Sequence, residues 1–112
     1  MDKKSAVTEF IEISAFSGAP AECKHHLIFG RGLRELADQD GLWIPLKNSE
    51  HNMSSEGLIY QIHENPTAEK LSKMLGQAIF EKEYYRNYTD LYDFKDDIAR
   101  KAFMKRYGRS WL

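Results

Sequence analysis

The sequence predicts an α+β fold in one domain, with an N-terminal strand, a core of two strands and a short helix, and two C-terminal helices. Three observations predict it. β-branched and aromatic residues gather in short segments of the first half, and an apolar period of about 3.6 residues runs through the second half. The length of 112 residues fits one domain of roughly 100 to 150 residues. We divide the chain into an N-terminal strand and turn (1–22), a core (23–65) and C-terminal helices (66–112).

The strands are expected in the first half. AVTEFIEISAF, residues 6–16, is rich in β-branched and aromatic side chains and predicts a strand. Gly18 and Pro20 then predict a turn. HLIF (26–29) is a second short extended segment, and the apolar LWIPL (42–46) predicts a third strand.

Short helices are expected around this last strand. Residues 33–40, LRELADQD, contain good helix formers and stop before Gly41. Another short helix is expected to begin near Asn48 or Ser49, which are good capping residues. LIYQIH, residues 58–63, fits a strand or a helix equally well.

Two longer helices follow. Asn65 and Pro66 predict the start of the first, because a capping side chain precedes a residue that needs no N–H donor. Residues 87–93 are expected to connect it to a second helix over 94–107, which ends at a Gly108 C-cap. The side chains expected to face the core are Leu71, Met74, Leu75, Ala78, Ile79, Tyr85, Ile98, Ala102 and Phe103.

Composition limits the function only broadly. The chain is 42% hydrophobic and 29% charged, with a formal net charge of −1, so binding to nucleic acid would need a local basic patch. A single cysteine cannot form an internal disulfide. No secretory signal is visible and no apolar run approaches the roughly 18 residues of a membrane span. These observations predict a cytosolic protein.

Histidine is the residue type that suggests chemistry. The chain has four histidines, and His25 and His26 are adjacent. Imidazole nitrogens bind divalent ions, and a free imidazole can accept a proton near neutral pH. Neighbouring residues of a strand point to opposite sides, so we expect one of this pair to bind metal and the other to act differently. Four unrelated surface histidines are the alternative.

Larger motifs carry a resemblance to a known family. The stretch CKHHLIFGRGLRELADQDGLWIPL, followed by SEHNMSSEG, IHEN, LGQAIFEKE and FMKRYGRSWL, resembles small phage and prophage proteins of the HNH endonuclease superfamily, also called ββα-metal nucleases. The likeness covers residues 23–112. It implies a ββα-metal core at 23–65 and a cytoplasmic location in a bacterial host.

The resemblance also implies residue roles. The first histidine of the pair, His25, would bind one divalent ion (Zn, Mg, Mn or Ni), with His51 and His63 as further ligands. His26 would be the general base that takes a proton from water. The hydroxide would attack a DNA phosphodiester while the ion stabilises the added negative charge.

The sequence departs from the family pattern at three places. Gly41 stands near the position of the middle asparagine of many relatives. Twelve residues separate His51 from His63, a spacing that on one helix would turn the two side chains about 120° apart, so a bend or loop must intervene. Cys23 is alone where many relatives carry CxxC pairs, and we expect it to be a small, partly buried residue.

Basic residues near the histidine pair are candidates for contact with DNA. Lys24, Arg31 and Arg34 would anchor phosphates, although solvated surface charge is the alternative for Arg34. A second basic group near the C-terminus could contact DNA or complement the helix dipole, and the dipole is the preferred interpretation. It consists of Arg100, Lys101, Lys105, Arg106 and Arg109, with Tyr107 and Trp111 between them.

Two alternatives to a nuclease remain open. One is a non-catalytic binding module that keeps the ββα scaffold to recognise a protein or nucleic acid partner. The net charge and the departures above favour it. The other is a homodimeric packing protein whose histidines are incidental.

Overall fold

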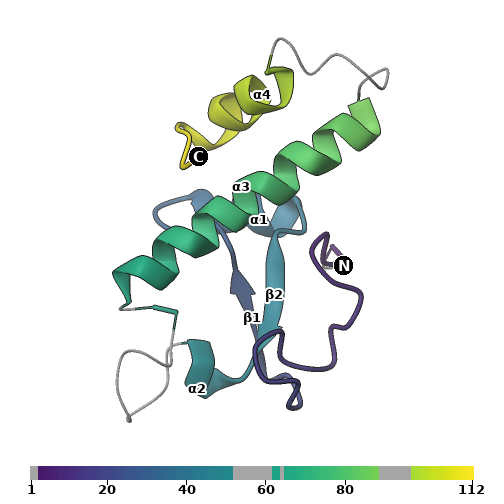
Figure 1. Ribbon diagram of the computed structural model, residues 1–112, viewed down its shortest axis with the longest axis vertical. Helices are drawn as coiled ribbons and strands as arrows, with labels where there is room; N and C mark the ends of the chain where they lie inside the picture. Colours follow the sequence, from purple (N-terminus) through teal and green to yellow (C-terminus); the bar gives the residue numbers. More distant parts are fainter. Residues whose placement is uncertain (1–2, 52–61, 64, 89–96) are drawn as a thin grey trace.

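The computed structural model describes residues 3–51, 62–63, 65–88 and 97–112. Within them it has a two-stranded antiparallel sheet and four helices, in the order β1, α1, β2, α2, α3, α4. The long helix α3 crosses the hairpin, and α4 lies on the other side of α3 from the hairpin (Figure 1). The α+β class predicted from the sequence is confirmed.

The hairpin pairs β1 (Cys23–His26) with β2 (Trp43–Leu46), and His25 faces Ile44 in the register. The helix α1 (Leu33–Gln39) connects the two strands. The predicted LWIPL strand and the helix after residue 33 are therefore confirmed. An extended segment was predicted at 26–29, but the strand β1 lies three residues earlier and ends at the histidine pair.

The predicted strand over residues 6–16 is wrong. This segment forms turns, with a single β-bridge between Ile13 and Pro20. The hydroxyls of Ser5, Thr8 and Ser14 accept hydrogen bonds from backbone N–H groups two or three residues later. Such local bonds compete with strand pairing, and they explain why β-branched composition misled the prediction.

The remaining helices are α2 (Asn48–His51), α3 (Pro66–Tyr88) and α4 (Ile98–Tyr107). The predicted starts of α2 and α3 are confirmed, and the Asn65 side chain caps α3 by accepting a hydrogen bond from the Ala68 N–H. Gly108, with φ 86°, forms the predicted cap of α4. The expected first turn of α4 at 94–96, most of the connection at 87–93 and most of LIYQIH lie outside the described residues.

The buried face of α3 differs from the one predicted by apolar periodicity. Leu71 and Leu75 are 58% and 42% exposed, whereas Ser72, Gly76 and Gln77 are buried. An ideal Cβ on Gly76 would lie 2.7 Å from Cγ1 of the buried Ile28. The helix therefore approaches the chain just after β1 so closely that only glycine fits at this position.

Two apolar clusters flank this contact. One contains Ile28, Ala37, Leu42, Phe103 and Tyr107, so it joins α1 and α4 to the start of β2. The other contains Leu27, Ile44, Leu46 and Ile62. In α4, Phe103 is fully buried as predicted, whereas Ile98 and Ala102 are half-buried and Ala99 and Tyr107 take the inner positions.

Polar bonds connect α4 and the C-terminal tail to this core. The Tyr107 hydroxyl donates to Asp40 at 2.5 Å, and the Arg106 guanidinium pairs with the same carboxylate at 2.7 Å. The buried Gln77 amide donates to the Ser110 hydroxyl and accepts from the Trp111 N–H. The tail is thereby held against α3.

We predict that Gly76→Ala destabilises the protein. An alanine normally gains about 0.5–1 kcal/mol over glycine inside a helix, but overpacking against Ile28 should cost about 1–3 kcal/mol. Urea unfolding should therefore show a lower free energy of unfolding. Lys70→Ala, at an exposed position of the same helix, is the control and should change it by less than about 0.5 kcal/mol. A Gly76→Ala protein more stable than wild type would contradict the close approach of α3.

Candidate metal centre

Three histidine side chains converge at one point. His25 comes from β1, His51 from the end of α2 and His63 from the segment before α3. One nitrogen of each ring lies within 4.8 Å of the corresponding nitrogens of the other two. The three histidines therefore lie close enough together to bind one metal ion.

Backbone pairing explains how His63 reaches His51 across twelve residues. The Ile62 N–H donates to the Glu50 carbonyl at 2.9 Å, and the His63 N–H donates to the His51 carbonyl at 3.2 Å. The α2 turn is itself held by Glu50, whose carboxylate accepts hydrogen bonds from the Lys47 N–H and the Ser14 hydroxyl. The bend that the spacing required is thus present.

His25 is buried with one nitrogen bonded and one open. Its Nε2 lies 2.7 Å from the Ser72 hydroxyl of α3. Its Nδ1 is, among the described residues, the only buried side-chain nitrogen or oxygen without a hydrogen-bond partner. Buried polar atoms are nearly always satisfied, so this nitrogen is a candidate metal ligand.

In each of the other two rings, Nε2 faces the cluster and Nδ1 faces outward. Their Nε2 atoms lie 3.1 Å apart at the centre of the cluster. On the outer side, His63 Nδ1 makes a long 3.4 Å contact with Glu69, and His51 Nδ1 lies 3.7 Å from the Cys23 sulfur. Histidines that bind metal usually donate their second N–H in this way, which fixes the ring.

The Cys23 sulfur lies next to Nδ1 of His51, and Cys23 is not part of the cluster formed by His25, His51 and His63. Burial, with Glu22 and Glu50 nearby, raises the pKa of its thiol, and its sulfur also contacts the Leu46 carbonyl at 3.5 Å. The sulfur is not among the atoms that lie together in the three-histidine cluster. The sequence interpretation of a small, partly buried residue is therefore supported.

The cluster keeps the imidazoles of His25 and His51 neutral. Burial, and then the charges that His51 and His63 would carry, lower the pKa of His25 to about 3. Burial and the neighbouring His63 and Arg34 lower the pKa of His51 to about 4. Neutral imidazole is the form that binds metal, so the two rings need lose no proton to do so at neutral pH.

The spacing of the His51 and His63 nitrogens fits a small divalent ion. Two nitrogens bound tetrahedrally to zinc at about 2.0–2.1 Å would lie about 3.3–3.4 Å apart, close to the 3.1 Å between His51 and His63. Three histidines with a fourth position left open are a known arrangement of catalytic zinc. Because nickel and other ions also accept imidazole, the ligands do not select one metal.

His26 lies outside the three-histidine cluster and bonds to α1. Its Nε2–H donates to the Asp38 carboxylate at 2.9 Å, and this bond lowers the pKa of Asp38. The ring is largely buried, with 8% of the residue exposed. Among the described residues Nδ1 of His26 has no hydrogen-bond partner and is not sealed from solvent. This nitrogen is therefore available to a water molecule.

Of the basic residues predicted from the sequence, Arg34 lies near the cluster. Arg34, on α1, is near enough to His51 to lower its pKa, and both Arg31 and Arg34 are exposed. The Lys24 ammonium lies 4.4 Å over the Trp43 ring. Of the C-terminal bases, Arg100 and Arg106 each pair with a carboxylate of the protein, which supports a structural role for these two.

Lys73 is a basic residue near the cluster that sequence reasoning missed. Its ammonium lies 4.6 Å over the Phe29 ring, and Phe29 in turn contacts the rings of His63 and His25 at 4.6 and 5.6 Å. No described carboxylate lies within ion-pair distance of Lys73. Only the packing of α3 distinguishes it from the other lysines of this helix.

The partners of the histidines were also missed. Asp38 accepts a hydrogen bond from His26, and Glu69 contacts His63. Ser72 is hydrogen-bonded to His25. Glu69 is in the first turn of α3, where acids are common, and Ser72 is not among the residues of this helix that were expected to face the core. No motif in the sequence distinguishes them.

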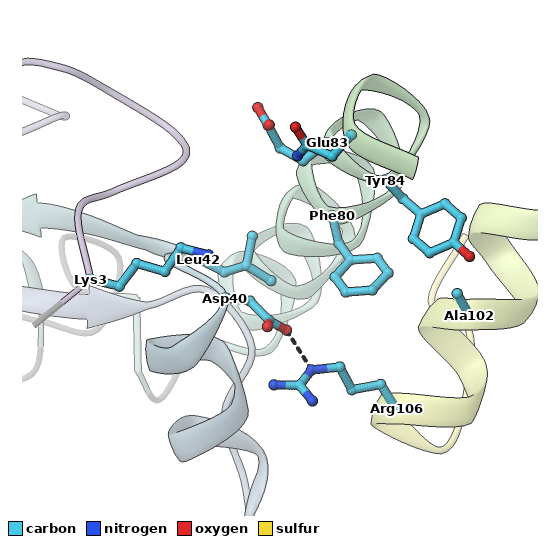
Figure 2. Close-up of a pocket in the computed structure, with 9 residues that line it drawn as sticks. Lys3, Asp40, Leu42, Phe80, Glu83, Tyr84, Ala102 and Arg106 are labelled. Atoms are coloured by element: carbon cyan, nitrogen blue, oxygen red, sulfur yellow. Dashed lines mark hydrogen bonds and ion pairs between the residues drawn. The ribbon is translucent and has the colours of Figure 1, made fainter. Parts of the chain in front are cut away.

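A cavity of about 420 Å³ lies at the opposite end of α3. Phe80 and Tyr84 of α3 face Ala102 and Arg106 of α4 across it, and the Asp40–Arg106 ion pair closes one side (Figure 2). No histidine lines it. The hollow is thus separate from the candidate metal centre.

Comparison with protein-family models, curated proteins and solved structures finds no match to this chain. The resemblance to HNH endonucleases therefore stays a prediction. Of the helices that the structure describes, none has the length and apolar character needed to cross a membrane.

We predict that His25→Ala and His51→Ala proteins lose most of their bound metal. Removal of one of three nitrogen ligands should weaken binding by on the order of 100-fold or more, because even outer partners contribute 10- to 100-fold. The measurement is metal content by mass spectrometry after purification and dialysis against zinc. His26→Ala is the control and should keep its metal. Equal metal in His25→Ala and wild type would end the assignment of this centre.

Proposed function

We propose that this protein is a metal-dependent, HNH-type endonuclease that hydrolyses DNA phosphodiester bonds. The observation that carries the proposal is the convergence of His25, His51 and His63, with His26 as the next residue of the same strand. The order of two strands and a short helix, β1, β2 and α2, also agrees with a ββα arrangement. A phage-encoded origin and a bacterial cytoplasmic location belong to the same proposal.

His25, His51 and His63 would hold one divalent cation. A cation bound there would stabilise negative charge that develops on a phosphodiester. The neutral state of the His25 and His51 imidazoles, which burial favours, suits this role.

His26 would be the general base. Because a carboxylate can only accept, the bond to Asp38 places the His26 proton on Nε2 and leaves a lone pair on Nδ1. That nitrogen can take a proton from water, and the Asp38 charge stabilises the imidazolium that results. Asp38 would thus hold the ring in the correct tautomer.

DNA would be held by bases near the cluster. Lys24, Arg31 and Arg34 were predicted to contact phosphates, and Lys73 adds a cation on the α3 side of the histidines. These local charges supply the attraction that a net charge of −1 does not.

The second candidate is a metal-containing binding module without catalytic activity. It is favoured by the position of His26, whose ring is largely buried and bonded to α1 instead of joining the other three histidines. In such a module the His26–Asp38 pair would only support the hairpin. A protein or nucleic acid partner would then be the expected ligand.

We predict that the wild-type protein nicks plasmid DNA with at least one of Mg²⁺, Mn²⁺, Ni²⁺ or Zn²⁺. His26→Ala should lower the rate by about 10²- to 10⁴-fold, the usual contribution of a general base, while metal content and thermal stability are retained. Gel quantification of nicked plasmid gives both rates. Tight metal binding without cleavage in any of the four ions would favour the binding module, and a fully active His26→Ala protein would refute the base role.

We also predict that Lys73→Ala weakens DNA binding without regard to DNA sequence. Loss of one phosphate contact should reduce the slope of log affinity against log salt by about 1. Fluorescence anisotropy with a labelled duplex at several salt concentrations measures this slope. Lys82→Ala is the matched control, because Lys82 is on the same helix but far along it and pairs with Glu83. The same loss in both variants would mean that Lys73 makes no specific contact.

A further inference from the structure

Ser72 makes two short hydrogen bonds at the buried side of His25. The residue is 7% exposed and lies on the face of α3 that packs on the hairpin. Its hydroxyl oxygen is 2.7 Å from the Leu27 carbonyl oxygen and also 2.7 Å from His25 Nε2. One hydroxyl thus links the backbone after β1 to the ring of a candidate metal ligand.

Counting protons assigns the tautomer of His25. A serine hydroxyl has one proton, and a carbonyl oxygen can only accept, so the Ser72 proton lies on the bond to Leu27. The Ser72 oxygen must then accept from His25, which places the imidazole proton on Nε2. If the hydroxyl donated to His25 instead, two acceptor oxygens would face each other at 2.7 Å.

The open nitrogen of His25 agrees with this assignment independently. Nδ1 is buried and has no partner among the described residues. A proton on Nδ1 would be a buried donor without an acceptor, which is unfavourable. Without that proton, Nδ1 carries a lone pair in a ring that packs edge-on against both His51 and His63 at 5.1 Å.

We propose that Ser72 is a positioning residue that holds His25 in the Nε2–H tautomer and so prepares Nδ1 as a metal ligand. The proposal rests on the metal centre of the proposed function. Glu69 stands three residues earlier on the same face of α3 and contacts Nδ1 of His63 in the same outer position. The start of α3 would thus orient two of the three imidazoles, although it contributes no ligand.

The first test is the protonation site of His25 in metal-free protein, measured by long-range ¹H–¹⁵N correlation NMR. We expect the proton on Nε2 in wild type and a mixture of tautomers in Ser72→Ala. A proton on Nδ1 in wild type would overturn the proposal whether or not the protein binds metal. This reading of wild type needs no variant and stands even if Ser72→Ala fails to fold.

The second test is zinc affinity, measured by competition with a chromophoric chelator. Ser72→Ala should bind zinc 10- to 100-fold more weakly, as expected for loss of an outer partner, and Ser72→Thr, which keeps the hydroxyl, should recover most of this loss. Ser110→Ala is the control, because it removes a hydroxyl bond to α3 through Gln77 without contacting a histidine. Unchanged affinity in Ser72→Ala would overturn the positioning role. Absence of zinc binding in wild type would overturn the metal centre itself, and the NMR result distinguishes the two failures.

Discussion

The arrangement of the candidate site depends on the close contact between α3 and the backbone that follows β1. Gly76 makes this contact possible, because any side chain there would meet Ile28. One helical turn earlier, Ser72 reaches both the Leu27 carbonyl and the His25 ring. A packing constraint in the core therefore also determines how a buried histidine is oriented.

Three imidazoles in one place, one buried and two half-buried, are unfavourable unless they share a ligand. Burial, and then the charges that neighbouring imidazoles would carry, lower the pKa of His25 and of His51. The folded protein therefore presents neutral lone pairs to one point, where a cation would stabilise the folded state over the unfolded chain. The site and the stability of this end of the molecule are linked through the same residues.

Several elements could be predicted from local sequence because their causes are local. LWIPL, the Asn65–Pro66 start of α3 and the Gly108 cap follow from side chains and backbone preferences within a few residues. The N-terminal segment was predicted wrongly, because hydroxyl-to-backbone bonds of Ser5, Thr8 and Ser14 outweigh its β-branched composition. The buried face of α3 was also predicted wrongly. Apolar periodicity assigns leucines to the core, and it cannot recognise that Gly76 lets the helix approach Ile28 closely.

By itself, the sequence determined which residues could bind a metal, and that His25 and His26 must face different ways, because strand geometry is set by the backbone. Only the tertiary structure decided that His63 lies beside His51, twelve positions earlier in the chain, and that Cys23 contacts the outer nitrogen of His51. It also decided which side chains are the partners of the histidines, namely Asp38, Glu69 and Ser72. The physical reason is that these contacts join side chains far apart in the chain. Their distances follow from how α1, α2 and α3 pack on one hairpin, which no local pattern encodes.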